Sequence, residues 1–263
     1  MIGDDRAAAT DRYYRAILDQ YEAETANRGD ERFWAAVAER WTGGTVLELG
    51  AGTGRVTAIL ARTAALVVAV DVSPAMLERA RPRLSRLANV RLVTADMAAL
   101  RLRASFDLVV AANDPWSHLL QPAARHAALG VVAAHLAPSG RFILDALWFN
   151  RAALARRTRR GGERTTRVVP SPAGPLRIVG WWRCTADGRC LARYDYRWPA
   201  GRRVAAFRAQ AWTEEALAAA LARAGLVETA RWGDYSGSLW SADAPALVVE
   251  ARRTVATDAG ALV

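Results

Sequence analysis

The feature that most constrains this chain is a short apolar run that ends in three alternating glycines. Residues 45–49 have the length and composition of a buried strand, and Gly50, Gly52 and Gly54 follow at once. Apolar residues at helical spacing begin at position 56. A strand that turns through glycines into a helix brings bare backbone and free N–H groups close to whatever lies above the turn. The pattern therefore predicts a ligand-binding turn at the carboxyl end of a strand.

Acidic residues mark the ends of three successive predicted strands. Glu48 lies just before the first glycine, Asp71 ends the run 66–70, and Asp96 follows the run 90–94. A carboxylate at the tip of the second strand can accept hydrogen bonds from both hydroxyls of a ribose. The spacing G-x-G-x-G differs from the G-x-G-x-x-G of dinucleotide sites. If only the glycines are considered, a tight structural turn or a nucleotide site would explain them as an alternative to the ligand-binding turn.

Together these residues resemble motif I and the following strand ends of class I S-adenosylmethionine (SAM) methyltransferases. The segments 135–142 and 233–238 look like those of bacterial small-molecule methyltransferases of this class. The resemblance implies SAM as cofactor, with its ammonium near Glu48, its ribose on Asp71 and its adenine amino group on Asp96. The cofactor-binding residues that it implies are Tyr21, Glu48, Gly50, Ala51, Gly52, Gly54, Asp71, Val72, Met76, Asp96, Met97 and Asn113.

The order of predicted elements indicates an α/β fold with a doubly wound, mostly parallel sheet, because strands and helices alternate through 45–145. The runs 226–232 and 246–252 are joined by a short loop and predict an antiparallel pair. The resemblance implies seven strands, of which the last is antiparallel. After the fifth strand, alternating stretches predict a small antiparallel β insertion, and they span 176–183, 190–198 and 202–212.

The chain divides into five predicted parts. These are an N-terminal helical lid (1–42), a SAM-binding core (43–147), a β insertion that caps the substrate or forms a dimer contact (148–212), the C-terminal part of the core (213–253) and a disordered tail (254–263). Residues 6–27 predict a helix with tyrosines on its apolar side, and Asp30 is placed to cap a second helix. That apolar side either packs as core or closes over SAM, and the sequence leaves both readings open.

Composition limits the classes of function. The chain has 263 residues and a net charge of +10, and all its basic charge is arginine because it contains no lysine. The charge favours anionic partners, but the basic residues are scattered and no RNA-binding module is evident. The longest apolar runs are far shorter than the roughly 18 residues of a membrane span, and the N-terminus lacks a signal core. A cytoplasmic location is therefore expected.

The two cysteines flank a predicted turn at Asp187-Gly188. A two-residue loop would place Cys184 opposite Leu191, so the thiols of Cys184 and Cys190 would lie on opposite faces of the hairpin. We therefore expect free thiols. No metal is expected, because two cysteines do not suffice for a zinc site.

His118 is the candidate catalytic residue. It lies shortly after the fourth predicted strand, 106–111, where similar proteins, including amino-sugar N-methyltransferases, often carry a histidine. An imidazole with a pKa near 6.5 suits a base at neutral pH, and a base helps when the methyl acceptor is a hydroxyl or a protonated amine. A histidine that only orients the substrate is an equal alternative.

Other residues point to a substrate pocket. The run 113–116 partly resembles the Asn-Pro-Pro-aromatic motif of amino-directed methyltransferases, with Asp114 in place of a proline. The arginine-rich segment 151–167 either binds an anionic group or is a mobile loop. The predicted substrate contacts are Tyr14, Trp116, His118, Trp148 and Trp182.

The leading hypothesis is methyl transfer from SAM to the nitrogen or oxygen of a small molecule in specialised metabolism, by in-line displacement. One alternative is a nucleic-acid methyltransferase. The other is a SAM-binding protein that transfers no methyl group, such as a SAM-using cyclase or lyase or a regulatory subunit. A homodimer through the β insertion is a further expectation.

Overall fold

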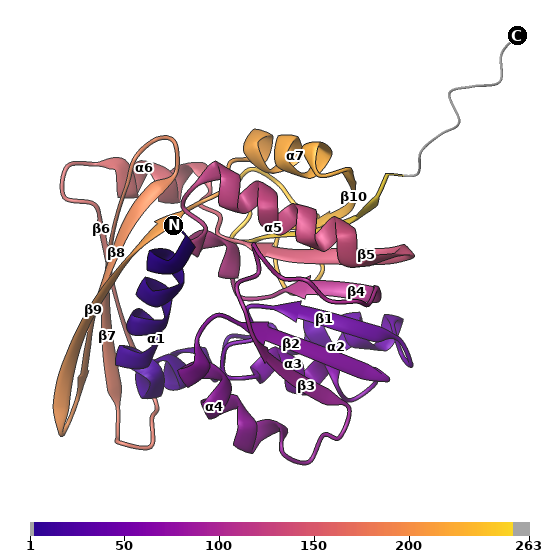
Figure 1. Cartoon of the computed structure of the whole chain (residues 1–263). Helices are drawn as coiled ribbons and strands as arrows, with labels where there is room; N and C mark the ends of the chain where they lie inside the picture. The colour runs from indigo at the N-terminus through magenta and orange to yellow at the C-terminus, as the bar shows by residue number, and fades with distance from the viewer. Residues whose placement is uncertain (1–2, 255–263) are drawn as a thin grey trace, which may run out of the picture.

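A computed structural model describes residues 3–254 of the chain and has a mixed α/β architecture (Figure 1). The larger sheet has seven strands in the order β10-β11-β5-β4-β1-β2-β3. Their bounds are β1 (Thr45–Leu49), β2 (Leu66–Asp71), β3 (Val90–Thr94), β4 (Phe106–Ala111), β5 (Leu136–Ala146), β10 (Leu226–Trp232) and β11 (Leu247–Arg253). The predicted fold class is confirmed.

The last strand is the antiparallel element of this sheet. β11 pairs antiparallel with both β10 and β5, whereas β5, β4, β1, β2 and β3 pair in parallel. Leu247, Val248 and Val249 are all buried, because helices cover both faces of the sheet at this position. The predicted antiparallel last strand is therefore correct.

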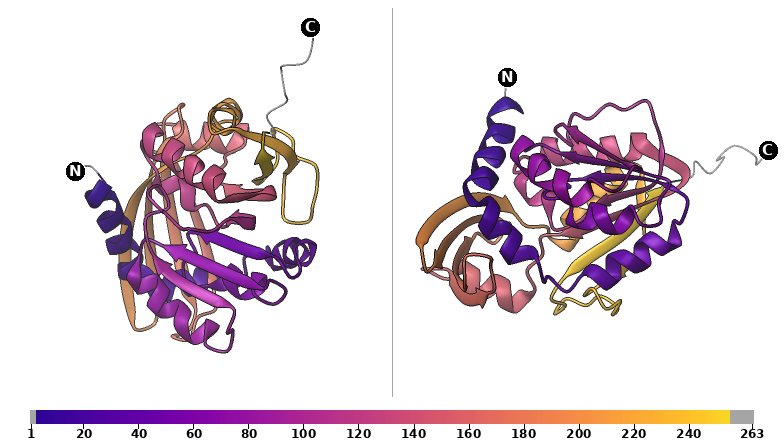
Figure 2. Two further views of the ribbon diagram at one scale, coloured as in Figure 1. Left: turned by 45° about the vertical axis from the view of Figure 1, so that its right-hand side comes forward. Right: turned by 90° about the horizontal axis from the view of Figure 1, so that it is seen from below.

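Helices cover the two faces of the large sheet (Figures 1 and 2). One apolar cluster joins the sheet to α5 (Pro122–His135) and α7 (Glu214–Arg223), and a second joins it to α2 (Glu31–Arg40) and α3 (Arg55–Leu60). On α2, Phe33, Trp34 and Val37 form the predicted apolar stripe and are buried. Burial of each such side chain contributes about 1.5–3 kcal/mol.

Side chains cap some helix starts but not the start of α2. The hydroxyl of Ser73 accepts a hydrogen bond from Met76 N at the start of α4 (Pro74–Leu84), and that of Thr213 caps α7 in the same way. Asp30 lies at the start of α2 but does not cap it. Its carboxylate instead accepts hydrogen bonds from Trp34 Nε1 at 3.1 Å and from Arg55 Nη1 at 2.5 Å. The expected capping role of Asp30 was wrong because its carboxylate is bound by these side chains.

The insertion folds as a separate four-stranded antiparallel sheet in the order β6-β7-β8-β9. The strands are β6 (Glu163–Val169), β7 (Leu176–Cys184), β8 (Arg189–Trp198) and β9 (Gly201–Gln210), preceded by α6 (Arg151–Thr158). α6 and most of β6 fall in the segment 151–167, for which a mobile loop was one of the two alternatives. β6 is an edge strand whose side chains are mostly exposed, and α6 buries no residue, so neither shows the hydrophobic period that marks a strand or helix.

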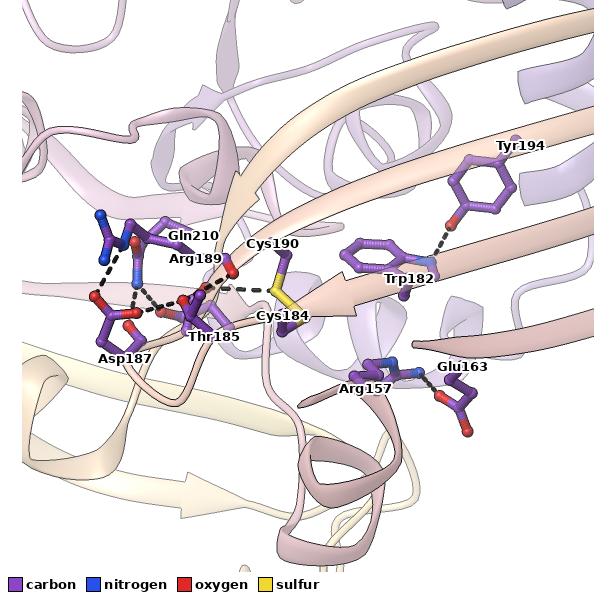
Figure 3. Close-up of a disulfide and its surroundings, with 12 residues drawn as sticks. Arg157, Glu163, Trp182, Cys184, Thr185, Asp187, Arg189, Cys190, Tyr194 and Gln210 are labelled. Carbon is purple, nitrogen blue, oxygen red and sulfur yellow. Dashed lines mark hydrogen bonds and ion pairs between the residues drawn. A yellow bond between two sulfur atoms is a disulfide. The ribbon is translucent and has the colours of Figure 1, made fainter. Parts of the chain in front are cut away.

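The cysteines form a disulfide at the tip of the β7–β8 hairpin (Figure 3). Thr185 N donates to Arg189 O at 2.8 Å, and Gly188 adopts a φ of 80°. The loop therefore has three residues rather than two, and Cys184 pairs directly with Cys190. The expectation of free thiols was wrong, because the extra loop residue shifts the strand register and brings both side chains to one face.

The helix α1 (Gly3–Thr25) lies between the two sheets (Figures 1 and 2). Ile17 is buried against Ile178 and Tyr196 of the small sheet, and its non-helical backbone marks a kink in α1. The apolar side of this helix therefore packs against the small sheet. Of the tail expected to be disordered, residues 255–263 lie outside the described residues.

Candidate functional site

The glycine turn and the end of β2 are bonded to one another. Gly50, Gly52 and Gly54 all adopt positive φ, which a glycine tolerates without steric cost. Gly52 N donates to Asp71 Oδ2 at 2.7 Å, and Ser73 N donates to Asp71 Oδ1 at 2.8 Å. These two backbone donors fix the Asp71 carboxylate at the carboxyl edge of the sheet.

A cavity of about 50 Å³ lies at this edge, and we call it the glycine-turn cavity. It brings together nine of the predicted cofactor-binding residues: Tyr21, Gly50, Gly52, Asp71, Val72, Met76, Asp96, Met97 and Asn113. A Cβ added to Gly52 would point at Tyr21 Oη and Met76 Cε, so this glycine leaves open backbone there. Open backbone next to fixed carboxylates fits an adenosyl ligand.

Three predicted cofactor residues lie outside this cavity. Glu48 and Ala51 line a smaller cavity next to it, which shares Tyr21 in its wall. Glu48 accepts a hydrogen bond from Thr57 Oγ1 at 2.5 Å, and burial raises its pKa to about 7. Gly54 lines neither cavity; an added Cβ there would lie 2.9 Å from Leu84 Cδ1, so this glycine serves the close packing of α3 on α4.

The N-terminal half of α1 covers the glycine-turn cavity. Arg6 forms an ion pair with Asp96, and Ser73 Oγ donates to Asp11 Oδ1 at 2.6 Å. Tyr21 Oη accepts a hydrogen bond from Asn113 Nδ2 at 2.8 Å. A cavity of this size holds only a few water molecules. The lid function predicted for residues 1–42 stays a prediction.

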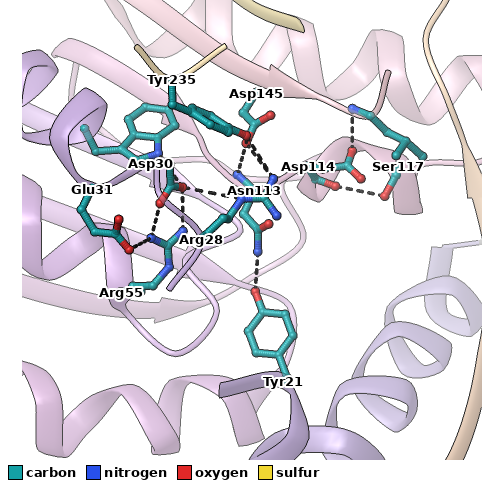
Figure 4. A network of polar contacts seen from close by, with 12 residues as sticks. Tyr21, Arg28, Asp30, Glu31, Arg55, Asn113, Asp114, Ser117, Asp145 and Tyr235 are labelled. Atoms are coloured by element: carbon teal, nitrogen blue, oxygen red, sulfur yellow. Dashed lines mark hydrogen bonds and ion pairs between the residues drawn. The ribbon is translucent and has the colours of Figure 1, made fainter. Parts of the chain in front are cut away.

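The loop after β4 is held in a strained conformation. Asn113 and Asp114 have φ values of 60° and 63°, in the left-handed region that non-glycine residues rarely adopt. Asn113 N donates to Asp145 Oδ2, and Leu147 N donates to Asp114 Oδ1, each at 2.9 Å (Figure 4). Two carboxylates thus hold the loop against β5, as is common where strain persists at functional sites.

Asp145 is the centre of a polar network that sequence reasoning missed. Tyr235 Oη donates to Asp145 Oδ2 at 2.7 Å, and Arg28 lies 3.5 Å from the same oxygen (Figure 4). Arg28 also pairs with Asp30, which binds Arg55 at the start of α3. The network joins the α1–α2 junction to the ends of β4 and β5. Tyr235 lies in the segment 233–238, which looks like that of bacterial small-molecule methyltransferases. This likeness was the only signal in the sequence for a role of Tyr235.

A second cavity, of about 510 Å³, opens beside the first. Four predicted substrate residues line it: Tyr14, His118, Trp148 and Trp182. Tyr13, Tyr194 and Phe207 add further rings to its wall, so we call it the aromatic cavity. The insertion supplies Trp182, Tyr194 and Phe207, and it therefore forms part of this wall.

The fifth predicted substrate residue does not reach the cavity. Trp116, in the short 3₁₀ helix η1 (Pro115–His118), is 0% exposed and packs on Phe142 in the core. Trp116 was therefore wrongly predicted as a substrate contact. The single turn of η1 directs His118 to the cavities and Trp116 into the core.

Both cavities share four lining residues, namely Tyr14, Tyr21, Asn113 and His118. His118 Nε2 lies 2.8 Å from Tyr14 Oη, and the His118 ring packs 5.2 Å from the Phe207 ring. Burial lowers the pKa of His118 to about 4, so its imidazole is neutral at pH 7. These residues form the boundary at which a ligand in one cavity would meet a ligand in the other.

Three carboxylates line the aromatic cavity, and they differ in their partners. Glu24 pairs with Arg167, and Asp145 with Arg28. Asp114 has no ion-pair partner among the side chains that the structure describes. Burial, together with the nearby Asp145, raises the pKa of Asp114 well above its usual value.

Within residues 3–254, no group of histidine, cysteine and acidic side chains is arranged to hold a metal ion. In the same residues, no helix combines the length and apolar character needed to cross a bilayer.

Comparison with known proteins gives consistent results. Residues 46–140 match a family described as a methyltransferase domain. The cypemycin N-terminal methyltransferase from a Streptomyces species is 32% identical over 225 residues, which cover 84% of this chain and 87% of that protein.

Solved structures resemble the chain over most of its length. A SAM-bound amino pentose methyltransferase of calicheamicin biosynthesis, from Micromonospora echinaspora, has a TM-score of 0.70 at 27% identity and covers 89% of this chain and 96% of its own. The CcbJ methyltransferase from Streptomyces caelestis has a TM-score of 0.73 at 23% identity, covering 86% of this chain and 90% of its own. At that lower identity the likeness shows the fold alone.

Proposed function

Since the chain belongs to the SAM-dependent methyltransferases, we propose that it transfers the methyl group to an amine nitrogen of a small molecule held in the aromatic cavity. One similar protein is named an N-terminal methyltransferase and another an amino pentose methyltransferase. An N-terminus and an amino pentose both carry an amine. The observation that carries the proposal is the buried carboxylate of Asp114 in the wall of that cavity, which has no described side chain at ion-pair distance and whose pKa stays raised although the charge of Arg28 opposes the shift.

A buried carboxylate without a cation is unfavourable, because burial removes the water that would stabilise its charge. A protonated amine in the aromatic cavity offsets this cost by pairing with Asp114. The rings of Tyr14, Trp182 and Phe207 add cation–π attraction for the same charge. A neutral hydroxyl substrate would gain from neither contact, which is why we favour nitrogen over oxygen.

The methyl group would be transferred at the boundary between the glycine-turn cavity and the aromatic cavity. SAM supplies an electrophilic methyl group on a sulfonium centre that leaves readily. Asp71, Asp96 and the open backbone at Gly52 would hold its adenosyl part, and Glu48 would attract its ammonium group. Tyr14 and His118 line both cavities and would place the acceptor nitrogen, since such displacements depend mainly on alignment.

An ammonium must lose a proton before its nitrogen can attack, and we assign that proton to Asp114. Transfer from the ammonium to the carboxylate turns two buried charges into two neutral groups, which burial favours. His118, with its lowered pKa, is a weak proton acceptor but a neutral hydrogen-bond partner for Tyr14. Of the two roles predicted for His118, we therefore propose the orienting one.

The test measures S-adenosylhomocysteine formed from SAM with amine acceptors and with their N-acetylated counterparts as matched controls. An amino-pentose glycoside and a short peptide with a free N-terminus serve as probes. We expect turnover with at least one free amine and none with its acetylated form. Asp114→Asn should lower kcat/KM by about 100-fold or more while SAM affinity is retained.

Three outcomes would contradict the proposal. They are methylation of a hydroxyl in the acetylated probe, methyl incorporation into tRNA or duplex DNA but into no amine, and an Asp114→Asn variant with normal kcat/KM. Asp243→Asn is the matched control variant, because Asp243 is an exposed carboxylate that lines neither cavity.

A further inference from the structure

A third cavity, of about 710 Å³, lies between the start of α5, α7 and the adjoining ends of β8 and β9. None of its lining residues lines the glycine-turn cavity or the aromatic cavity. We call it the arginine cavity, because Arg125, Arg189, Arg208 and Arg223 line it. Its size suits a small molecule, and the proposed methyl transfer makes no use of it.

The charge of the arginine cavity is strongly one-sided. Asp187 is the one acidic residue in its wall, and Arg189 binds it at 2.9 Å (Figure 3). Within the described part of the chain, no carboxylate lies at ion-pair distance from Arg125, Arg208 or Arg223. Three guanidinium groups of the described chain therefore share one cavity without a carboxylate at ion-pair distance, and the only charge that acts on Arg125 from outside it is that of Asp114.

Arg125 is the buried member of this group. It is only 8% exposed, and its guanidinium lies 4.2 Å above the Trp212 ring. Arg125 Nε donates to Leu119 O at 2.8 Å, and Nη2 donates to Gln210 O at 2.6 Å. The described residues accept hydrogen bonds from its Nε and Nη2 and not from its Nη1. Burial lowers the pKa of Arg125 to about 10, and the charge of Asp114 only partly opposes this shift.

The start of α5 adds a second source of positive potential. Gln121 and Pro122 line the cavity at the first turn of this 14-residue helix, and the Gln121 side chain makes no capping hydrogen bond. Pro122 has no N–H, and Ala124 N and Arg125 N donate to Gln121 O, so the positive potential here comes from the aligned peptide dipoles of the helix.

We propose that the arginine cavity is a second ligand site, which binds a small molecule through a phosphate or carboxylate group. Guanidinium groups match both oxyanions, because their planar N–H pairs can bind two oxygens at once. Trp212, Ala216 and Ala220 offer apolar surface for the rest of the ligand. The arginine cavity has four arginines and one carboxylate in its wall, whereas the aromatic cavity has two arginines and three carboxylates, so the two cavities suit ligands of different charge.

The experiment is calorimetric titration of the full chain at constant ionic strength. Pyrophosphate and citrate are the two probes, and they distinguish a phosphate ligand from a carboxylate one. S-adenosylhomocysteine is present at saturation, so that neither anion can enter the glycine-turn cavity. We expect saturable binding of one anion per chain for at least one probe.

Variants locate the binding. Arg208→Gln together with Arg223→Gln removes two exposed guanidiniums from the cavity and should weaken the affinity by about tenfold or more. Arg62→Gln with Arg203→Gln is the matched control, because both arginines are exposed, lie outside the cavity and change the net charge equally. Arg125 is left intact, since it also holds two backbone carbonyls.

Two results would overturn the proposal. One is the absence of saturable heat for both anions in the wild-type chain. The other is an equal loss of affinity in the two double variants, which would mean that the anion responds to net charge and not to this cavity.

Discussion

Tyr14 Oη lies 2.8 Å from His118 Nε2, and both side chains line the glycine-turn cavity and the aromatic cavity. One residue comes from α1 and the other from η1, so the pair exists only when α1 lies against the large sheet. The boundary between the two cavities therefore depends on the position of the N-terminal helix.

Removal of this hydrogen bond should slow turnover without weakening cofactor binding. We expect Tyr14→Phe to lower kcat by about tenfold, because the imidazole loses the partner that fixes its orientation. A double-mutant cycle with His118→Asn checks the pairing, and the two effects should be strongly non-additive. Additive losses would show that the two side chains act separately.

Asp71 should dominate the affinity for the cofactor. Asp71→Asn keeps an oxygen that can accept from Gly52 N but loses the charge that binds hydroxyl groups strongly, so SAM affinity should fall by more than about tenfold. Titration calorimetry with S-adenosylhomocysteine measures this loss. Asp243→Asn, an exposed substitution outside the glycine-turn cavity, is the control and should bind normally.

Glu48 should make SAM affinity depend on pH. Burial raises the pKa of Glu48 to about 7, so the side chain is mostly protonated at pH 5.5 and half ionised at pH 7. Only the ionised form attracts the SAM ammonium, and affinity should therefore rise by about tenfold across this range. Above pH 7 the trend should level off, because an α-amino group itself loses its proton near pH 8.

The Glu48→Gln variant provides the comparison. Its affinity should be nearly constant between pH 5.5 and 7, and SAM binding at pH 6 should release about one proton in the wild type but none in the variant. Proton release is measured by calorimetry in buffers of different ionisation enthalpy. A pH dependence that persists unchanged in the variant would assign it to another group.

The disulfide should be detectable without a structure. Thiol titration of the unreduced, denatured chain should find no free thiol, because Cys184 and Cys190 are the only cysteines. Reduction should lower the free energy of unfolding by about 2 kcal/mol, in line with the short loop that the bond closes. The same reductant should leave the Cys184→Ala/Cys190→Ala variant unaffected. Free thiols before reduction would contradict the assignment.

The fold and the cofactor side of the site were predictable because their signals are local. The glycine turn, Asp71 and Asp96 each follow a strand directly, and parallel strands bring such positions to one edge. The prediction of seven strands with an antiparallel last strand also needed the resemblance to class I methyltransferases. The alternation of strands and helices alone does not say where the last strand inserts into the sheet.

The Asp145 network, the cysteine register and the direction of the Trp116 side chain depend on the folded structure, and a local sequence pattern does not show them. Asp145 gains its role from Arg28 and Tyr235, which are 117 and 90 residues away. The cysteine register depended on one loop residue, since a three-residue loop reverses the face that a two-residue loop predicts. Trp116 and His118 are two positions apart, and only the 3₁₀ turn decides which one faces the cavity.

The place of α1 has a practical consequence for work with truncated versions of the chain. Its tyrosine side packs on the small sheet, while Arg6, Asp11 and Asp19 bind side chains of the large sheet and of α4. Shortening α1 would uncover the glycine-turn cavity and, at the same time, leave Ile178 and Tyr196 of the small sheet in water. A fragment that starts at α2 is therefore an unsuitable reagent for studies of either sheet.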